Sequence, residues 1–150
     1  MRIWVDGDAC PQDVRDIVIR AAERLAIEVT FVANKELRLP RSKFIKFSRV
    51  GHGADVADSF IVQESAFGDL VISSDIPLAA LLVPKGVVVV TMYGDILNTA
   101  TINERLSIRN FMTDLRSGGV TTGGPRPFGI KERQAFAATF DRELTKLVRR

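Results

Sequence analysis

Two aspartates separated by one glycine, Asp6 and Asp8, follow a short apolar run at the start of the chain. The run Ile3-Trp4-Val5 is too short for a core helix and predicts a buried strand. Pro11 suits the first turn of a helix, because its missing N–H has no partner to lose there. The two carboxylates are therefore expected in a tight turn at the carboxyl end of a strand, where open α/β sheets bind ligands.

Two carboxylates held this close repel each other. At about 4 Å and an effective dielectric constant near 20 the repulsion is roughly 4 kcal/mol, and a bound cation or a shared proton relieves it. The plainer interpretation is an Asx-type turn in which Asp8 caps the next helix. For this pair alone the two interpretations have equal support.

Three further aspartates are expected near the same edge. Asp55 and Asp58 are three residues apart at the start of a predicted helix, so both project from one face of its first turn. Asp75 follows a predicted strand and precedes Pro77, whereas Asp69 precedes that strand and belongs to the opposite edge. Capping or the helix dipole explains each of the three alone.

A shared cation site explains the whole set, and its donors indicate the metal. Carboxylate oxygens without histidine or thiolate suit Mg²⁺ or Mn²⁺. Such ions serve phosphoryl chemistry, singly or in pairs. The candidate ligands are Asp6, Asp8, Asp55, Asp58 and Asp75.

The elements that must position these acids alternate along the chain. Strands are predicted at residues 3–5, 28–33, 43–50, 70–72 and 87–90, and helices at 12–26, 54–65, 78–82, 101–116 and 130–148. In the first helix, charged residues that include Arg15 lie opposite the apolar face. This alternation predicts one α/β domain over residues 1–150, with a mostly parallel central sheet of about five strands and helices on both faces. The strand that ends at Val5 is expected in the middle, and the helices from about residue 100 are expected to pack on the core.

Composition narrows the class of protein. The 150 residues are 46% hydrophobic and 26% charged, as in ordinary globular domains. A net charge of +3 permits a phosphate-bearing partner without requiring one. Single Cys10 and His52 exclude a disulfide framework and a zinc site built from cysteines or several histidines, and the acids beside Cys10 make it a poor nucleophile. No signal peptide or membrane span is recognisable, so a cytoplasmic protein is expected.

Cations gather in two places. The stretch from position 35 to 49 contains six Lys and Arg residues and one acid, Glu36. The cations form either a phosphate-contacting flank or a solvated edge strand. Arg109 and Arg116 share one face of a predicted helix and either bind a phosphate together or pair with neighbouring acids. A glycine-rich segment at 117–127 offers backbone N–H groups to an anion, a weak signal.

Five segments together resemble the YaiI/YqxD family, a bacterial group of uncharacterised proteins similar to PIN-like nuclease domains in fold and acidic positions. They are Val5-Asp6-Gly7-Asp8-Ala9-Cys10-Pro11, Val32-Ala33-Asn34, Gly53-Ala54-Asp55-Val56-Ala57-Asp58, Asp69-Leu70-Val71-Ile72-Ser73-Ser74-Asp75-Ile76-Pro77-Leu78-Ala79 and Thr122-Gly123-Gly124-Pro125. The resemblance implies a PIN-like fold with the five aspartates where that superfamily holds Mg²⁺ or Mn²⁺. The candidates for substrate contact are Asn34, Ser74, Arg109, Arg116, Gly123 and Gly124.

Three functions remain open. The leading one is metal-dependent hydrolysis of phosphodiesters in nucleic acid, with RNA favoured. The second is a haloacid-dehalogenase-type phosphatase with Asp6 as nucleophile and Ser73 or Ser74 binding the phosphate, although no lysine is well placed to pair with the aspartates. The third is a non-catalytic nucleic-acid-binding module.

Overall fold

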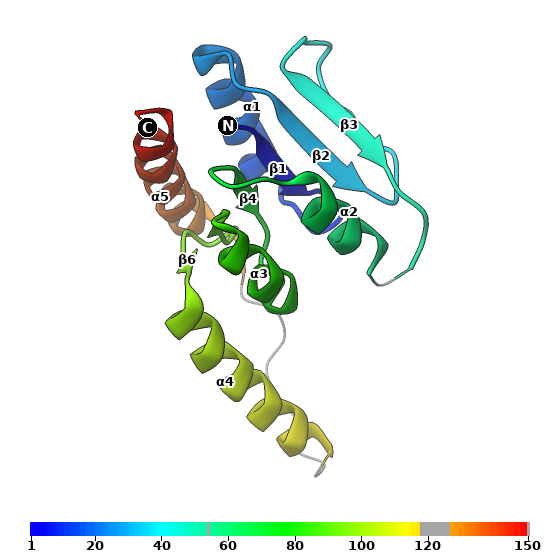
Figure 1. Cartoon of the computed structure of the whole chain (residues 1–150), viewed down its shortest axis with the longest axis vertical. Helices are drawn as coiled ribbons and strands as arrows, with labels where there is room; N and C mark the ends of the chain where they lie inside the picture. Colours follow the sequence, from blue (N-terminus) through cyan, green and yellow to red (C-terminus); the bar gives the residue numbers. More distant parts are fainter. Residues whose placement is uncertain (54, 118–126, 150) are drawn as a thin grey trace.

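A computed structural model describes residues 1–53, 55–117 and 127–149. In these ranges six strands form one sheet with the order β3-β2-β1-β4-β5-β6 (Figure 1). The strands are β1 (Ile3–Asp6), β2 (Val29–Ala33), β3 (Ile45–Arg49), β4 (Leu70–Ile72), β5 (Val88–Val90) and β6 (Ile96–Leu97). The first five pair in parallel and β6 pairs antiparallel with β5. The predicted α/β class with a mostly parallel sheet is confirmed, and β6 is a strand that the sequence pattern did not predict.

Helices cover both faces of the sheet. They are α1 (Gln12–Leu25), α2 (Val56–Glu64), α3 (Ile76–Leu82), α4 (Thr99–Ser117) and α5 (Ile130–Val148), with a short 3₁₀ turn, η1 (Val83–Lys85), after α3. Helices α1 and α5 pack on one face, and α2, α3 and the first turns of α4 pack on the other. Beyond those turns α4 extends away from the sheet, whereas α5 runs along it (Figure 1).

The central strand β1 is buried on both faces. Ile3 and Val5 are fully buried against α1 and α5, while Trp4, between them, packs on the side of α2 and α3. A strand covered on both faces needs a continuous apolar run, which explains why this segment does not alternate with polar residues. The central position predicted for this strand is confirmed by its pairing with β2 on one side and β4 on the other.

Strand register brings particular residues to the carboxyl edge. Asp6 pairs with Val32 of β2, and Val5 pairs with Ile72 of β4, so Ser73 follows directly beside Asp6. From β1 the chain continues to β2 on one side and returns through β4 on the other. This reversal of strand order creates a crevice at the carboxyl ends of β1 and β4, the usual ligand position in open α/β sheets.

Asp69 lies at the opposite edge of the sheet, as its position before β4 predicted. Its buried carboxylate accepts hydrogen bonds from the Trp4 indole N–H (3.1 Å) and from the backbone N–H groups of Arg2 (3.0 Å) and Ala66 (2.9 Å). Asp69 therefore joins the start of β1 to β4 and belongs to the framework.

Several local predictions need correction. The helix expected from residue 54 begins at Val56, and the strand expected over residues 43–50 covers Ile45–Arg49. Asp8 does not cap α1, because the N-cap residue is Pro11 and no side-chain cap bond is made there. No helix in the described ranges combines the length and apolarity needed to cross a bilayer.

Candidate functional site

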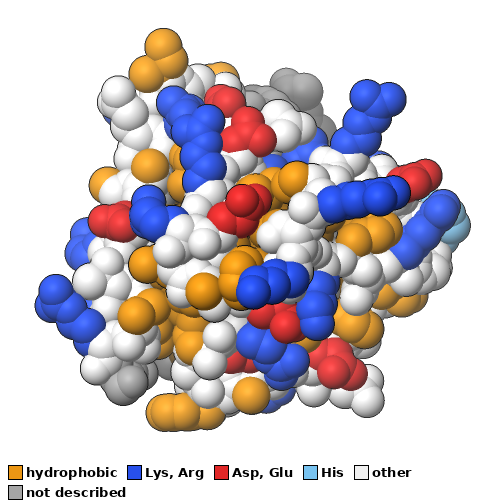
Figure 2. All heavy atoms as spheres, turned by 90° about the horizontal axis from the view of Figure 1, so that it is seen from above, with side chains coloured by type: hydrophobic (Ala, Val, Ile, Leu, Met, Phe, Trp, Pro, Cys, Tyr) orange, Lys and Arg blue, Asp and Glu red, His pale blue; other side chains and the backbone are white. Residues whose placement is uncertain are grey.

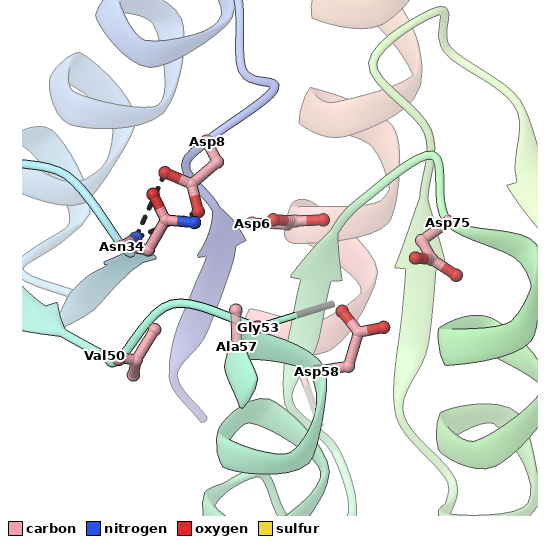
Figure 3. Close-up of a pocket in the computed structure, with 9 residues that line it drawn as sticks. Asp6, Asp8, Asn34, Val50, Gly53, Ala57, Asp58 and Asp75 are labelled. Carbon is pink, nitrogen blue, oxygen red and sulfur yellow. Dashed lines mark hydrogen bonds between the residues drawn. The ribbon is translucent and has the colours of Figure 1, made fainter. Parts of the chain in front are cut away.

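Four carboxylates line a cavity of about 360 Å³ at the carboxyl edge of the sheet (Figure 3). Asp6 ends β1, Asp8 lies in the turn after it, Asp58 lies in the first turn of α2, and Asp75 precedes α3. The wall is completed by Asn34, Val50, Gly51, Gly53 and Ala57. Among these described lining residues there is no lysine, arginine or histidine to balance the charge.

Asp6 lies at the centre of the cavity and is the residue most directly fixed by the sheet (Figure 3). The Ser73 hydroxyl donates a hydrogen bond to its Oδ2 at 3.1 Å. Burial raises the pKa of Asp6, the Ser73 hydrogen bond opposes that rise, and the charges of Asp75 and Asp8 add to it. Burial and the neighbouring charges therefore make the ionised form of Asp6 less favourable.

Asp8 is held by the end of the neighbouring strand. The backbone N–H of Asn34, directly after β2, donates to both of its carboxylate oxygens, at 3.1 and 2.9 Å. Asp8 therefore has a fixed position beside Asp6, supplied by a residue 26 positions away. The backbone of Asn34 supplies this contact, whereas the sequence had suggested Asn34 only as a substrate contact.

Asp58, in the first turn of α2, has a strongly raised pKa. Burial, the neighbouring carboxylates of Asp75 and Asp6, and the charge of Asp55 raise its pKa to about 6. The carboxylates of Asp58, Asp75 and Asp6 surround one space in Figure 3. Carboxylates that repel one another in this way are stabilised when they share a cation or a proton.

Asp75 both caps a helix and lines the cavity. Its Oδ1 accepts the backbone N–H of Leu78 at 3.0 Å, which caps α3, and its own N–H donates to the Ser73 hydroxyl at 3.1 Å. The capping interpretation of Asp75 is therefore correct. It does not remove the residue from the acidic cavity, which Asp75 still lines.

The donors fit a hydrated divalent ion better than a closed metal cage. In the described part of the chain, no three Asp, Glu, His or Cys side chains lie close enough together to hold an ion on their own. Magnesium keeps several of its waters and is usually bound through one or two carboxylates. The all-oxygen donor set of Asp6, Asp8, Asp58 and Asp75 matches Mg²⁺ or Mn²⁺ in this respect.

The other candidate residues are not among the described ones that line the acidic cavity. Asp55 is exposed and lines an adjacent, more apolar cavity of about 320 Å³, which shares Asp58 with the acidic one. Ser74 is exposed, accepts the backbone N–H of Met92 at 3.3 Å and is not among the residues that line the acidic cavity. Arg109 and Arg116 belong to α4, but their side chains lie outside the description. Gly123 and Gly124 lie outside the described residues.

Cys10 lies close to the acids, and its thiol is not a nucleophile at neutral pH. Its buried thiol has a pKa raised to about 12, chiefly by burial and to a lesser extent by the charge of Asp6, with Arg15 acting in the opposite direction. A thiol with that pKa is not ionised at neutral pH. Cys10 is therefore a poor nucleophile, as the sequence predicted, but the main reason is burial and not the nearby acids.

A second polar cavity borders the first and includes Lys35 and Arg38 from the basic stretch at 35–49, but the sequence did not indicate that Arg15 lines it too. Arg15, Lys35 and Arg38 line it together with Asp8. Arg15 was expected on the solvated face of α1, yet its Nε atom is buried. Helical spacing within residues 12–25 cannot reveal a cavity that Arg15 lines together with residues 35–38 of the segment after β2.

The fold and the site define an α/β protein with an acidic cavity at the point where the strand order reverses. Residues 4–146 match the family described as "Uncharacterized BCR, YaiI/YqxD family". The chain belongs to the YaiI/YqxD family, as its motifs predicted.

Curated relatives extend over almost the whole chain. A UPF0178 protein of Myxococcus xanthus is 54% identical over 149 residues, covering 99% of this chain and 97% of its own length. One from Dechloromonas aromatica is 52% identical over 147 residues, covering 98% of each. UPF0178 protein YaiI of Escherichia coli O81 is 48% identical over 149 residues, covering 99% of this chain and 98% of its own. No solved structure matches the chain.

Proposed function

We propose that this protein is a metal-dependent hydrolase of phosphodiester bonds in nucleic acid, with RNA as the favoured substrate and Mg²⁺ or Mn²⁺ as the cofactor. The observation that supports it best is the acidic cavity, which Asp6, Asp8, Asp58 and Asp75 line together. No lysine, arginine or histidine is among its described lining residues. Its place at the reversal of strand order adds to this support, since ligands bind there in open α/β sheets.

Each acid has a distinct proposed role. Asp6, Asp58 and Asp75 hold the ion between them, partly through its waters, because they surround one space (Figure 3). Asp8 lies on the other side of Asp6, where the Asn34 N–H fixes its carboxylate, and it orients the attacking water or holds a second ion. When bound, the ion lowers the pKa of a water and neutralises charge developing on the phosphate.

The finer assignment is a PIN-like nuclease domain. It rests on the resemblance of the acidic motifs, because the family itself is described only as uncharacterised and a fold alone does not define an activity. A net charge of +3 favours a polyanionic partner at long range. The acidic cavity would otherwise repel that partner near the reacting phosphate, so the ion should strengthen binding as well as take part in the reaction.

The phosphatase alternative has weaker support. That chemistry needs a lysine beside the aspartate nucleophile, and no lysine is among the described residues that line the acidic cavity. The Ser73 hydroxyl already donates to Asp6 and accepts from Asp75, and the Ser74 hydroxyl accepts from Met92. The Ser73 hydroxyl proton is therefore already used, and Ser74 is not among the residues that line the acidic cavity.

The test is hydrolysis of single-stranded RNA by the wild type and by Asp6→Asn, with Mg²⁺ or Mn²⁺. The substitution keeps the shape of the side chain and removes one negative charge, so most of the activity should be lost. In EDTA the variant should melt slightly higher, because repulsion among the remaining carboxylates falls. Asp13→Asn is the matched control, since Asp13 lies in the first turn of α1 outside the cavity.

The outcomes separate the possible functions. Equal cleavage by wild type and Asp6→Asn would mean that a contaminating nuclease is responsible. A variant that melts lower in EDTA would mean that Asp6 is structural. Binding of RNA and metal without any turnover would favour the non-catalytic module, and a trapped phospho-aspartate would favour the phosphatase.

A further inference from the structure

A basic cavity adjoins the acidic one and has no role in the function proposed so far. It has a volume of about 360 Å³ and lies between the start of α1 and the segment that follows β2. Three cations, Arg15, Lys35 and Arg38, line it with two acids, Asp8 and Glu36. The other lining residues are Gly7, Cys10, Gln12 and Leu37.

The three cations are not neutralised by the protein. None of the ion pairs found in the described part of the chain involves Arg15, Lys35 or Arg38. The Arg15 Nε atom is buried and has no hydrogen-bond partner among the described residues. A buried guanidinium N–H without an acceptor costs free energy, which an oxyanion in the cavity would recover.

Lysine and arginine side chains are common on the surface. On the face seen in Figure 2 they are interspersed with acidic and apolar side chains, and some of them lie against one another. The basic cavity is distinguished by the buried Arg15 Nε atom, which has no acceptor among the described residues. Guanidinium groups bind phosphate oxygens through paired N–H donors, and lysine adds a mobile point charge.

The position of the basic cavity relative to the acidic one is fixed by a shared residue. Asp8 lines both cavities, together with Asp6 in the acidic one and with the three cations in the basic one. The two cavities therefore adjoin at Asp8. Neighbouring phosphates of one strand can then occupy both, one at the proposed ion and the next among the cations.

We propose that the Arg15, Lys35 and Arg38 cavity binds the backbone phosphate next to the one that is cleaved. The inference rests on the proposed function and specifies its substrate: a strand of at least two linked phosphates, not a mononucleotide or a small phosphate monoester. The cations contribute to binding of the strand and not to the reacting atoms. Their removal should therefore raise KM much more than it lowers kcat.

The test uses binding in EDTA, so that it does not depend on turnover. The probe is a fluorescently labelled single-stranded oligonucleotide of ten nucleotides, titrated at several salt concentrations. Lys35→Ala/Arg38→Ala removes two exposed cations of the cavity and leaves the partly buried Arg15 in place. Arg20→Ala/Arg24→Ala removes the same charge from exposed positions further along α1. Affinity should fall about tenfold for the first variant and about twofold or less for the second.

A neutral backbone linkage identifies the phosphate itself. A methylphosphonate placed at each linkage in turn should weaken wild-type binding most at one position, and the same replacement should cost Lys35→Ala/Arg38→Ala almost nothing there. The dependence of log affinity on log salt should also fall by about 0.7 for the one lost phosphate contact. Equal losses for the two double variants, or an equal methylphosphonate effect in wild type and cavity variant, would overturn the inference and leave the proposed function standing. No binding by the wild type in EDTA would overturn the inference, while the hydrolysis assay with Mg²⁺ or Mn²⁺ tests the proposed function separately.

Discussion

The hydroxyl of Ser73 donates a hydrogen bond to Oδ2 of Asp6 over 3.1 Å, across the boundary between β4 and β1. The Ser73 hydroxyl oxygen also accepts a hydrogen bond from the backbone N–H of Asp75 at 3.1 Å. One side chain therefore positions two of the acids that line the cavity, at the point where the strand order reverses.

Replacing Ser73 by alanine should raise the pKa of Asp6 further. The hydrogen bond from Ser73 is the contribution that lowers this pKa, while burial and the charges of Asp75 and Asp8 raise it. Carboxyl carbon NMR of labelled aspartate in EDTA measures the change directly. Losing the two buried hydrogen bonds should also cost roughly 1–3 kcal/mol of unfolding free energy. An unchanged titration of Asp6 in Ser73→Ala would show that the hydroxyl does not control its charge.

The stability of the metal-free protein should fall as pH rises between about 4 and 6. The pKa of Asp58 is about 6 in the folded protein, against 3.8 for an ordinary aspartate, so the unfolded chain loses its proton first as pH rises. In that window the folded state binds more protons, and the unfolding free energy decreases with pH. The raised pKa of Asp6 acts in the same direction.

Asp58→Asn isolates one part of this pH dependence. Melting temperatures in EDTA should decline less steeply with pH than in the wild type, and the remaining decline is expected from Asp6. Asp13→Asn is again the matched control, because both residues lie in the first turn of a helix. If Asp58→Asn and Asp13→Asn give the same pH profile, the repulsion assigned to the cavity is absent.

Mg²⁺ or Mn²⁺ should stabilise the folded protein. A ligand that binds only the folded state contributes about 2.7 kcal/mol at 100 times its dissociation constant, which corresponds to roughly 5–10 °C for a domain of this size. Thermal unfolding with each ion, in wild type and Asp6→Asn, measures this shift. Equal shifts in the two proteins would place the ion somewhere other than the acidic cavity.

Asp69→Asn should destabilise the fold without acting on the acidic cavity. The Asp69 carboxylate accepts three N–H groups, and an asparagine amide keeps only one accepting oxygen. At least one buried donor then loses its acceptor, at a cost of about 1–3 kcal/mol. Urea unfolding gives this value, and RNA hydrolysis per folded molecule should stay close to that of the wild type. A large selective loss of activity would contradict the framework role.

The main sheet could be predicted because its signals are local. The continuous run at residues 87–90 marks a strand buried on both faces, and β5 is found within it. Strand β6 has only two residues, Ile96 and Leu97, which is too short for any periodic pattern. Its pairing with β5 depends instead on the turn between them, in which the backbone N–H of Thr91 donates to the Asp95 carbonyl.

The candidate site could be predicted in part, for the same physical reason. Strand ends and proline positions placed Asp6, Asp8 and Asp75 at one edge, and the structure brings them to one cavity with Asp58. The sequence could not decide between Asp55 and Asp58, because the choice depends on where the first turn of α2 begins. Arg38 belongs to the basic stretch that the sequence indicated, but Arg15 could not be assigned to it, because the two residues line one cavity only in the folded chain.

The single tryptophan gives the protein an internal optical probe. Trp4 lies on β1, two residues before Asp6, and its ring meets the edge of Phe60 on α2 with centroids 6.2 Å apart. Helix α2 also carries Asp58, so this ring contact spans the two elements whose acids are proposed to hold the ion. Any cation that draws α2 towards β1 should change the emission of Trp4, and occupancy of the cavity can be followed by fluorescence without a label.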